Sequence, residues 1–471
     1  MKTVFVSGNF FVLHPGHIRF LRFASACGDC LVVGVHNTQP NALYPTPQER
    51  CDVLGSLDFV NEVVLIEDDL QSALRRLKPK IVVKGKEYEK AHNVEASVLA
   101  EWNGIVLFSS GESTYSATEL LAPVTSDDIR WVRPQGYIRR HSIDLDRSKR
   151  FVCDFGKLQV VVIGDLIVDE YIHCEALGMS REDPTVVVSP QHTDRFLGGA
   201  GIVAAHAAGL GASTSFLSVA GADEVGEWSL ERLKDYNVNA TIIADESRPT
   251  TLKKRYRVST KTMLRVSHLR QHEVDERIAN KILETFSILA EETDLLVFAD
   301  FNYGCLPQDL VNALIAKARQ SGVLIAADSQ SSSQLGNIAR FHHVDLLTPT
   351  EHEARLALRA QNESLPTIGT RLLELAYARR AFITLGATGV LVFDQYEQKD
   401  HVESDQLAAL NRNPVDVAGA GDSMLIAGSM ALALGANSFE AAYIGSVAAA
   451  IQTSRVGNVP IKQSEMLKAL H

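Results

Sequence analysis

Two short runs of residues, far apart in the chain, have the types and spacing to handle phosphate groups. Near the amino terminus, His14, Gly16 and His17 fall within one turn of an expected helix start. Gly16 lets the backbone approach a phosphate closely, and the helix start supplies oriented N–H groups. Two imidazoles there can donate hydrogen bonds to a phosphate whose charge grows during reaction. This pattern suits attack on an α-phosphate.

The second run, Gly419-Ala420-Gly421-Asp422, leads into an apolar helix expected from Ser423. Its small residues leave space for phosphate oxygens at the positive end of that helix. A carboxylate would repel a resting anion, so Asp422 is better explained as a base that takes a proton from an attacking hydroxyl. The alternative is that Asp422 only stabilises the helix start. As a base, it suits transfer of a γ-phosphate.

Strands alternating with helices are expected around the first run, which predicts a parallel sheet covered on both faces. The expected strands are Val4–Val6, Leu31–Val35, Val63–Ile66, Ile81–Val83 and Ile105–Phe108, and the expected helices are Ile18–Ala26, Gln48–Leu57, Leu70–Leu77 and Val94–Trp102. Ligands bind at the carboxyl ends of the strands in such sheets. The loop that holds His14 and His17 lies at that end of the first strand.

A second alternation of strands and helices begins at Leu158 and predicts another parallel sheet. Its expected segments are the strand from Leu158 to Gly164, β-rich runs at Ile167–His173 and Thr185–Val188, the helix Ile202–Leu210, and strands at Leu295–Phe298, Val323–Ala326, Leu346–Leu347, Ala381–Leu385 and Gly389–Phe393. The β-rich runs form a small addition that could cover the site as a lid. Between the two sheets the apolar periodicity weakens, so we expect domains at 1–123 and 157–471 with a linker at 124–156. Within that linker, Arg139-Arg140-His141 is better explained as solvated than as a phosphate contact.

Composition narrows the class of protein further. The chain has 471 residues, 46% hydrophobic and 22% charged, with a net charge of -11, so two or three soluble domains are expected and nucleic acid is not the expected partner. Six scattered cysteines indicate buried or half-buried free thiols in a reducing cytoplasm, because the single Cys27/Cys30 pair is weak evidence for zinc. No segment predicts export or membrane insertion.

The segment from Gly8 to His17 resembles the opening motif of the cytidylyltransferase-like nucleotidyltransferases, and Val83-Lys84-Gly85 and Ser116-Ala117-Thr118 resemble later motifs of that family. The resemblance implies a Rossmann-like domain in which His14 and His17 stabilise the attacked α-phosphate and Lys84 holds phosphate charge. A solvated lysine at a strand end is the alternative for Lys84. The implied nucleotide contacts are Gly8, Phe10, Gly16, Ser116 and Thr118. Phe11 stands where the family usually has Asp, which leaves the metal and phosphate geometry open.

Residues 158 to about 465 resemble the ribokinase-like carbohydrate kinases. The motifs are Gly164-Asp165, Gly198-Gly199, Thr348-Pro349-Thr350-Glu351-His352-Glu353 and Asp416-Val417-Ala418-Gly419-Ala420-Gly421-Asp422, in the expected order. The resemblance implies that Asp422 is the base, that the backbone of Gly419, Ala420 and Gly421 is an anion hole, and that Glu353 organises Mg²⁺ through water.

On the sugar side, the resemblance implies contacts from Asp165, Gly198 and Gly199. Lys253 and Arg255 would hold a phosphate already on the sugar, although an exposed basic strand face explains these two equally well.

Within the ribokinase-like family the chain most resembles the heptose-phosphate kinases, through the motifs Ile163-Gly164-Asp165, Met179-Ser180-Arg181-Glu182-Asp183-Pro184 and Leu347-Thr348-Pro349. Relatives of those kinases carry a nucleotidyltransferase in the opposite domain order. Ile202 and Thr350 stand where Asn is usual. The run Asp328-Ser329-Gln330-Ser331 lacks the Lys and Gly of the heptose enzymes, and Tyr303 replaces another Lys. These departures leave two alternatives open, a different phosphorylated sugar or a weakened kinase, and the complete Gly419-Ala420-Gly421-Asp422 turn favours the first.

Together the two resemblances imply a cytoplasmic bifunctional enzyme of nucleotide-sugar synthesis. One site would phosphorylate a sugar or a heptose 7-phosphate-like sugar phosphate with Mg²⁺ and ATP, and the other would join a sugar 1-phosphate to ATP or CTP with release of pyrophosphate. A separate phosphatase and a homodimer are the expected partners, with no nucleic acid and no membrane. Two alternatives stay open: only one site is active, or the chain is a binding protein that senses nucleotides or sugar phosphates.

Overall fold

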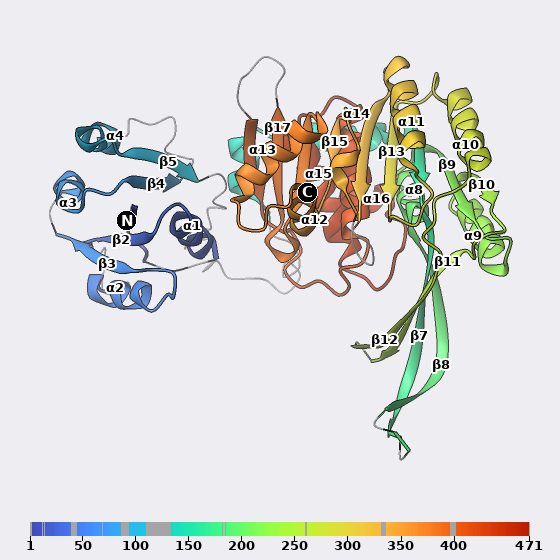
Figure 1. Ribbon diagram of the computed structural model, residues 1–471, viewed down its shortest axis with the longest axis horizontal. Coiled ribbons are helices and arrows are strands. Elements are labelled where there is room, and N and C mark those ends of the chain that lie inside the picture. Colours follow the sequence, from blue (N-terminus) through green and yellow to red (C-terminus); the bar gives the residue numbers. More distant parts are fainter. Residues whose placement is uncertain are drawn as a thin grey trace. The chain divides into compact units, whose positions relative to one another are not determined.

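The computed structural model describes residues 2–11, 13, 15–38, 45–67, 69–85, 94–109, 133–180, 182–183, 185–259, 261–330, 336–395 and 402–470. The chain divides into two compact units, which are described separately (Figure 1). The first comprises Met1–Ile129 with Ser404–Gln406, and the second comprises Arg130–Glu403 with Leu407–His471.

The first unit contains a five-stranded parallel sheet in the order β3-β2-β1-β4-β5. The strands are β1 (Thr3–Gly8), β2 (Cys30–His36), β3 (Glu62–Ile66), β4 (Ile81–Gly85) and β5 (Ile105–Ser109), and the helices are α1 (Pro15–Ala26), α2 (Pro47–Gly55), α3 (Leu70–Leu77) and α4 (Val94–Leu99). Because side chains alternate along a strand, Val4 and Val6 pack with α1 and α2 while Phe5 packs with α3 and α4. The predicted parallel sheet covered on both faces is confirmed. Its direction of winding reverses between β1 and β4, which is where such sheets bind ligands.

The second unit is built on a nine-stranded sheet in the order β10-β9-β6-β13-β14-β15-β16-β17-β18. The strands are β6 (Gln159–Gly164), β9 (Ser213–Ala220), β10 (Asn239–Ala244), β13 (Leu295–Asp300), β14 (Leu324–Ser329), β15 (Leu346–Leu347), β16 (Arg380–Thr384), β17 (Val390–Gln395) and β18 (Val402–Leu407). The helices of this unit are α6 (Gln135–Arg140), α7 (Leu145–Asp154), α8 (Ala200–Gly209), α9 (Glu224–Asp235), α10 (Glu276–Leu289), α11 (Gln308–Gln320), α12 (Glu351–Leu358), α13 (Leu365–Ala376), α14 (Ala420–Ala433), α15 (Ser438–Gln452) and α16 (Gln463–Ala469). The strands from β10 to β16 pair in parallel, and β17 runs antiparallel to β16. A second α/β sheet was predicted and is confirmed.

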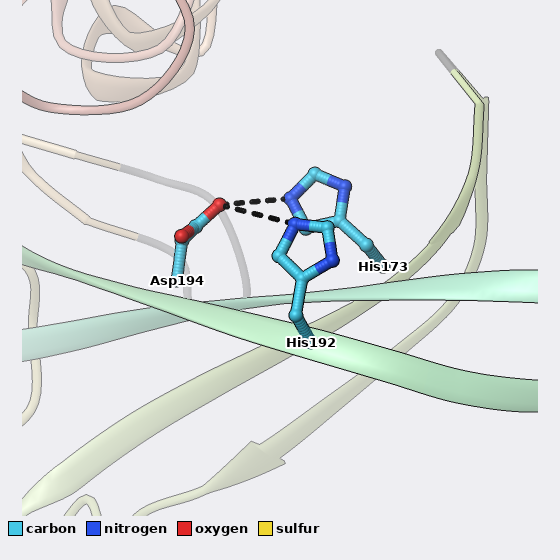
Figure 2. Close-up of side chains that lie close together, drawn as sticks. All are labelled: His173, His192 and Asp194. Atoms are coloured by element: carbon cyan, nitrogen blue, oxygen red, sulfur yellow. Dashed lines mark hydrogen bonds and ion pairs between the residues drawn. The ribbon is translucent and has the colours of Figure 1, made fainter.

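A separate four-stranded sheet, here called the lid, projects from the second unit (Figure 1). Its order is β12-β11-β7-β8, formed by β7 (Leu166–Met179), β8 (Val186–Gly199), β11 (Thr251–Val258) and β12 (Lys261–His268). The strands β7 and β8 are antiparallel, with His173 directly opposite His192 (Figure 2). The lid is larger than predicted, because β8 continues to Gly199, the residue that caps α8.

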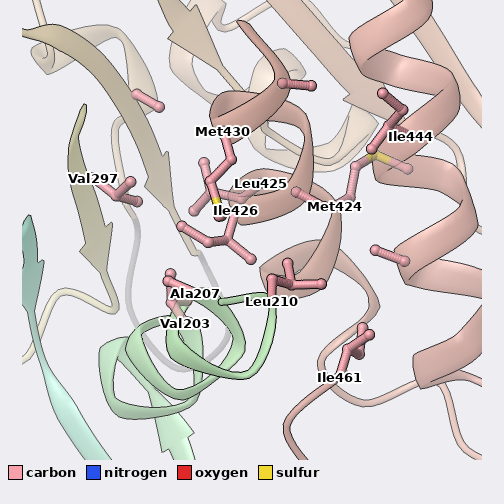
Figure 3. Packing of buried hydrophobic residues seen from close by; sticks show 14 of the residues in the cluster. Val203, Ala207, Leu210, Val297, Met424, Leu425, Ile426, Met430, Ile444 and Ile461 are labelled. Carbon is pink, nitrogen blue, oxygen red and sulfur yellow. The ribbon is translucent and has the colours of Figure 1, made fainter. Parts of the chain in front are cut away.

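The core beside the large sheet forms where three apolar helices meet. Val203, Ala207 and Leu210 from α8 and its end face Leu425 and Ile426 of α14 (Figure 3). Helices that are apolar all round, as α8, α14 and α15 are, must be buried on every side. This packing holds the start of α14 rigidly. Ile202 is one of these core residues, fully buried in α8.

Residues 133–156, within the segment expected to connect the two domains, contain two helices that pack on the second unit. Val152 and Phe155 are fully buried in the core of the second unit. The Tyr137 hydroxyl donates to the Phe439 carbonyl at 3.1 Å, and the His141 ring stacks on Phe439 at 3.8 Å between centroids. Apolar contacts spaced along two short helices are hard to recognise among so many charged residues. The rest of the expected linker, 124–132, lies outside the described residues.

The cysteines are free, as predicted, with Cys305 buried, Cys153 exposed and the other four half-buried. In the part of the chain that the structure describes, every helix is too short or too polar to cross a lipid bilayer.

Candidate functional site

The turn before α14 has the geometry of an anion site. Gly419 has φ of 75°, and a Cβ there would lie 2.5 Å from Asn458 Oδ1, so this position requires glycine. A Cβ on Gly421 would meet nothing within 4 Å, so the first turn of α14 is open on that side. The first N–H groups of a helix have no partner inside the helix. They are therefore available to an anion placed against Gly421.

Asp416 holds this turn in place. Its Oδ1 accepts from the Ala418 N–H at 3.1 Å, and its Oδ2 accepts from the Gly457 N–H at 3.1 Å and from the Tyr171 hydroxyl at 3.2 Å. Tyr171 belongs to the lid strand β7, so the lid and the anion turn share one carboxylate. The sequence motif contains Asp416, but nothing in the sequence pairs it with Tyr171.

A cavity of about 910 Å³ opens in front of the turn. It is lined by the carboxyl ends of β14 and β16, the start of α12, the first turn of α14 and the middle of α15, and it contains Asp328, Glu353, Gly421 and Asp422. Its place at the carboxyl ends of parallel strands is where this class of sheet binds ligands. Its volume is suited to a nucleotide-sized ligand.

Asp422 is buried, with 5% of its surface exposed, and its pKa is raised to about 7. Burial is the main cause, the negative charges of Asp169 and Glu353 raise the pKa further, and Lys253 lowers it. A carboxyl group with a pKa near neutral can accept a proton at physiological pH and keep enough basicity to be useful. The nearby Gln330 amide lies 3.5 Å from Asp422 Oδ1.

Two further carboxylates lie near Asp422 and could hold a divalent cation. Glu353 Oε2 accepts from the Thr350 N–H and hydroxyl at 2.8 Å each, which closes a capping box at the start of α12. Thr350 therefore has a clear structural role in place of the usual Asn. Asp328 Oδ1 is buried without a hydrogen-bond partner among the described residues, and burial together with Glu353 and Asp422 raises the Asp328 pKa well above its usual value. An orphan carboxylate oxygen among other carboxylates fits Mg²⁺, which prefers oxygen ligands.

The carboxylate of Asp165, which was expected to contact the sugar, accepts hydrogen bonds from backbone N–H groups. These come from Phe301 at 2.8 Å, Cys305 at 3.1 Å and Tyr303 at 3.3 Å, so the carboxylate positions the loop after β13. Burial, with the charge of Asp300, raises the Asp165 pKa to about 6.

Asp169, four residues later, lies close enough to Asp422 for its negative charge to raise the Asp422 pKa. Its Oδ2 would be 2.6 Å from a Cβ at Gly198, so glycine at 198 leaves room for this carboxylate. Asp169 was not singled out from the sequence. It lies four positions after Asp165, inside the β-rich run Ile167–His173, and an even spacing along a strand was visible in the sequence.

Lys253 and Arg255 are half-buried on the lid strand β11, not exposed. The Arg255 Nη1 lies 2.8 Å from Asp169 Oδ1, and its guanidinium carbon lies 5.1 Å from the Tyr171 ring centroid. The Lys253 ammonium lies 5.1 Å from the ring centroid of Tyr303. Arg255 is thus paired with Asp169, and Lys253 lies beside an aromatic ring in the same unit.

Ser329 takes part in a buried network. Its hydroxyl donates to Asp300 Oδ2 at 2.9 Å and accepts from the Asn302 amide at 3.2 Å, while Arg340 pairs with Asp300 at 2.8 Å. Ser329 and the buried Tyr303 therefore support the loop beside the cavity.

In the first unit, Gly8, Phe10 and His17 come together at the carboxyl end of β1. The rings of Phe10 and His17 meet edge to face with centroids 5.3 Å apart, and the Phe10 ring would be 2.9 Å from a Cβ at Gly8. Phe10 is buried with φ of 49°, an uncommon conformation for a bulky residue.

Arg50 of α2 is a residue that sequence reasoning missed in this region. It is buried and donates to the carbonyls of Asn9, His36 and Thr38, and its guanidinium carbon lies 4.9 Å from the Phe11 ring centroid. It therefore clamps the loops that follow β1 and β2, with Phe11 as its aromatic neighbour.

Lys84, at the end of β4, is not a solvated lysine: its ammonium lies 2.7 Å from Glu95 Oε1, with 19% of its side chain exposed. Gly16 lies in the first turn of α1. His14, Ser116 and Thr118 lie outside the described residues.

The protein therefore consists of two α/β units, each built on a sheet with parallel strands whose carboxyl ends carry the candidate site residues. Residues 157–463 match the family model of the pfkB family carbohydrate kinases, and residues 5–122 match the cytidylyltransferase-like model. The chain belongs to the pfkB family of carbohydrate kinases, with a cytidylyltransferase-like domain preceding the kinase domain. Both resemblances expected from the motifs are confirmed.

Among curated relatives, the chain is similar to the bifunctional protein HldE of Helicobacter hepaticus, with 30% identity over 317 residues, covering 66% of this chain and 64% of that protein. It is also similar to the bifunctional protein HldE of Geobacter sulfurreducens, with 30% identity over 320 residues, covering 67% and 63%. The match thus spans slightly less than two thirds of each relative.

Among solved structures, the chain resembles Arabidopsis thaliana ribokinase complexed with ribose and ATP, with a TM-score of 0.52 and 20% identity over 66% of this chain and 98% of that one. Escherichia coli phosphofructokinase-2 in complex with potassium gives a TM-score of 0.54 and 17% identity, with the same coverage. At these identities the likeness shows the fold of the second unit.

Proposed function

We propose that the second unit transfers the γ-phosphate of ATP to a hydroxyl of a sugar or sugar phosphate. Asp422 takes the hydroxyl proton, the sugar oxygen forms a bond to the γ-phosphorus, and the bond from that phosphorus to the β,γ-bridging oxygen breaks, leaving ADP. The N–H groups at the start of α14, beside Gly419 and Gly421, stabilise the charge that develops on the transferred group. The observation that carries this proposal is the buried Asp422, with a pKa of about 7, beside the open face of Gly421.

The acidic cluster supplies the place for Mg²⁺. Asp328 and Glu353 would hold the ion, Glu353 through water, since the Asp328 oxygen is otherwise an orphan. When bound, Mg²⁺ supplies charge neutralisation for the nucleotide phosphates. ATP was bound by the Arabidopsis ribokinase of the same fold, which supports this choice of nucleotide.

On the sugar side, Asp169 accepts hydrogen bonds from sugar hydroxyls, and Gly198 and Gly199 allow close approach of the sugar to the backbone. Asp165 contributes indirectly, by positioning the loop after β13. Lys253 and Arg255 hold a phosphate already present on the sugar. A heptose 7-phosphate-like substrate is favoured by the motifs shared with heptose-phosphate kinases.

The first unit, by this proposal, joins a sugar 1-phosphate to a nucleotide. A phosphate oxygen of the sugar attacks the α-phosphorus of ATP or CTP, and pyrophosphate leaves. His14 and His17 stabilise the attacked phosphate, Lys84 holds phosphate charge, and Gly8, Phe10, Gly16, Ser116 and Thr118 form the nucleotide site. The position of His17 at the carboxyl end of β1, near the point where the sheet reverses direction, supports this assignment.

Together the units make a bifunctional enzyme of nucleotide-sugar synthesis. The kinase product of a sugar phosphate carries two phosphates, and one must be removed before the transferase step, so a separate phosphatase completes the sequence. We place the domain boundaries at 1–123 and 157–471, with α6 and α7 packed on the kinase side.

The lid supports a homodimer. Its strands expose large apolar side chains, an unfavourable surface for an isolated chain. These are Leu177, Met179, Val186, Met263 and Leu264, exposed between 46% and 62%. A second copy of the lid is the occupant with a matching surface.

The test is mass spectrometry of products from the full-length protein with Mg²⁺, ATP or CTP, and a panel including heptose 7-phosphate and heptose 1-phosphate. Wild type should form a bisphosphate and a nucleotide-sugar, Asp422→Asn only the second, and His17→Ala only the first. If the wild-type protein forms only one of the two products, the proposal is reduced to a single active site. Binding of nucleotide without any product would replace it by a sensing role.

A further inference from the structure

Three side chains of metal-ligating types converge on the lid, and none of them belongs to the proposed active sites (Figure 2). His173 comes from β7, and His192 and Asp194 come from β8. His173 and His192 face each other across the antiparallel pair, and Asp194 is two residues from His192, on the same face of its strand. The register of β7 and β8 therefore determines the cluster.

The geometry brings one donor atom of each residue to a common point. His173 Nε2 lies 3.0 Å from Asp194 Oδ2, and His192 Nε2 lies 3.9 Å from the same oxygen. The three donor atoms all lie within 4.8 Å of one another. Around a metal bound at about 2.0–2.1 Å, neighbouring atoms of a tetrahedron lie about 3.3 Å apart. The three separations are therefore close to those between corners of that tetrahedron, and rotation of the two imidazoles out of their stack would complete the match.

A simple hydrogen bond explains only part of this arrangement. It accounts for His173 and Asp194, but the second imidazole is beyond hydrogen-bond distance from Asp194. The two rings stack with centroids 4.2 Å apart and planes inclined by 5°, and both present Nε2 to the same carboxylate. The stacking accounts for the present orientation of His192, and an ion lying in the plane of both imidazoles would require the two parallel rings to turn apart.

We propose that His173, His192 and Asp194 form a site for a divalent transition metal ion, with Zn²⁺ as its preferred physiological occupant. Two imidazole nitrogens and one carboxylate oxygen are a common ligand set for Zn²⁺, whereas Mg²⁺ and Ca²⁺ prefer oxygen ligands. The side chains are 28%, 64% and 50% exposed, so the fourth position is open to solvent.

The place of this site on the lid gives it a mechanical role. A register irregularity follows directly after His173, where Cys174 pairs with Pro190 and Gln191 is left over. Such bulges weaken strand pairing locally. A metal ion bridging β7 and β8 at this point joins the two strands where the ladder is disrupted.

The same face of the lid leads to the kinase cavity. Asp169, Tyr171 and His173 alternate along one face of β7. The Tyr171 hydroxyl donates a hydrogen bond to Asp416 in the turn before α14, and the negative charge of Asp169 raises the pKa of Asp422. Arg257, opposite His173 on β11, lies over the Tyr171 ring at 5.0 Å. Stiffening the hairpin at His173 therefore acts two residues from the contact between lid and anion turn.

The direct test is Zn²⁺ binding to the chelator-treated full-length protein, measured by competition with a chromophoric chelator at neutral pH. His173→Ala and His192→Ala should each weaken one Zn²⁺ site per chain by about 100-fold or more, and Asp194→Asn by about 10-fold. His268→Ala is the matched control, because it removes an exposed lid imidazole outside the cluster. It should leave that site unchanged.

Equal Zn²⁺ stoichiometry and affinity in wild type and all three cluster variants would overturn the proposal, since any bound metal would then lie elsewhere. Absence of Zn²⁺ binding to the folded wild type would also overturn it, leaving a hydrogen-bonded surface cluster only. Because His192 and Asp194 are half or more exposed, their variants are expected to fold even if His173→Ala does not.

Hydrogen exchange tests whether a metal ion bound between β7 and β8 stiffens this hairpin. At a Zn²⁺ concentration 100 times its Kd, amides of β7 and β8 that exchange through local opening of the hairpin should slow by about 100-fold in wild type. They should not respond in His192→Ala. Unchanged exchange in Zn²⁺-loaded wild type would reject the stiffening role, and this readout does not depend on either enzymatic activity.

Discussion

The hydroxyl of Tyr171, on the lid, donates to Asp416 Oδ2 at 3.2 Å, in the turn that forms the candidate anion hole. Burial raises the Tyr171 pKa to about 12, so the hydroxyl remains a donor over the physiological range. The same Asp416 carboxylate holds the N–H groups of Ala418 and Gly457. The position of the lid and the shape of the anion turn are therefore linked by one hydrogen bond between residues 245 positions apart.

Removing that link should slow the kinase without unfolding it. Tyr171→Phe keeps the ring packed against Phe196 and Arg255 but loses one hydrogen bond, usually about 0.5–1.5 kcal/mol. We expect the kinase kcat/KM to fall about 5- to 10-fold, measured by coupled ADP release. Tyr256→Phe, on the outer face of the lid, is the control and should keep wild-type kinetics. Equal kinetics for both variants would contradict the link.

The pKa of Asp422, about 7, predicts the pH profile of the kinase. A general base must be unprotonated, so log kcat/KM should rise with unit slope below about pH 7 and level off above it. Asp422→Asn should lower kcat by about 10²- to 10⁴-fold and remove this pH dependence. A pH-independent wild-type rate between pH 5.5 and 8 would rule out Asp422 as the base.

The same pKa predicts a stability effect of opposite sign to that of most carboxylates. Its folded value lies above the usual 3.8, so between about pH 4 and 7 the folded state binds more protons than the unfolded state, and stability falls as pH rises. Asp422→Asn should therefore match wild type only below about pH 3.8, and its stability advantage over wild type should grow by about 2–3 kcal/mol between pH 5 and pH 8. Urea unfolding of the kinase domain at both pH values measures this. If the variant is less stable than wild type at pH 8, favourable contacts of the ionised Asp422 carboxylate must outweigh the free-energy cost of its burial, which would contradict this prediction.

Two glycines in one turn, Gly419 and Gly421, should respond differently to alanine. Gly419→Ala must adopt φ near 75° and meets Asn458 at 2.5 Å, so it should destabilise the fold by at least about 1–2 kcal/mol. Gly421→Ala places its methyl in open space, so the melting temperature should stay within a few degrees of wild type. Its kinase activity should nevertheless fall at least about 10-fold, because the methyl occupies the phosphate position. Wild-type kinetics for Gly421→Ala would place the phosphate elsewhere.

Variants of Lys84 and Glu95 can distinguish a structural role of Lys84 from a catalytic one. Lys84→Met leaves the buried Glu95 without its 2.7 Å partner and should lower stability by about 1–3 kcal/mol. The double variant Lys84→Met with Glu95→Gln should recover most of that loss. If Lys84 also holds phosphate, nucleotide-sugar formation should remain about 100-fold below wild type in the double variant. Recovery of activity together with stability would make Lys84 a purely structural residue.

Much of this protein follows from its sequence alone. The alternation of β-rich runs and amphipathic helices predicts both parallel sheets, because the 2-residue and 3.6-residue periods are local properties. The turns at Gly16 and at Gly419 to Asp422 are equally visible, since a helix start with small residues is encoded within a few positions.

Other features depend on which distant segments meet. The hydrogen bonds between Asp165 and the loop after β13, the bond from Tyr171 to Asp416, and the clamp made by Arg50 each join elements that are distant in the sequence. The packing of residues 133–156 and the convergence of His173, His192 and Asp194 depend on helix docking and strand register in the same way. A sequence specifies local conformation through short-range sterics, whereas contacts across strands and between layers appear only once the whole chain is packed.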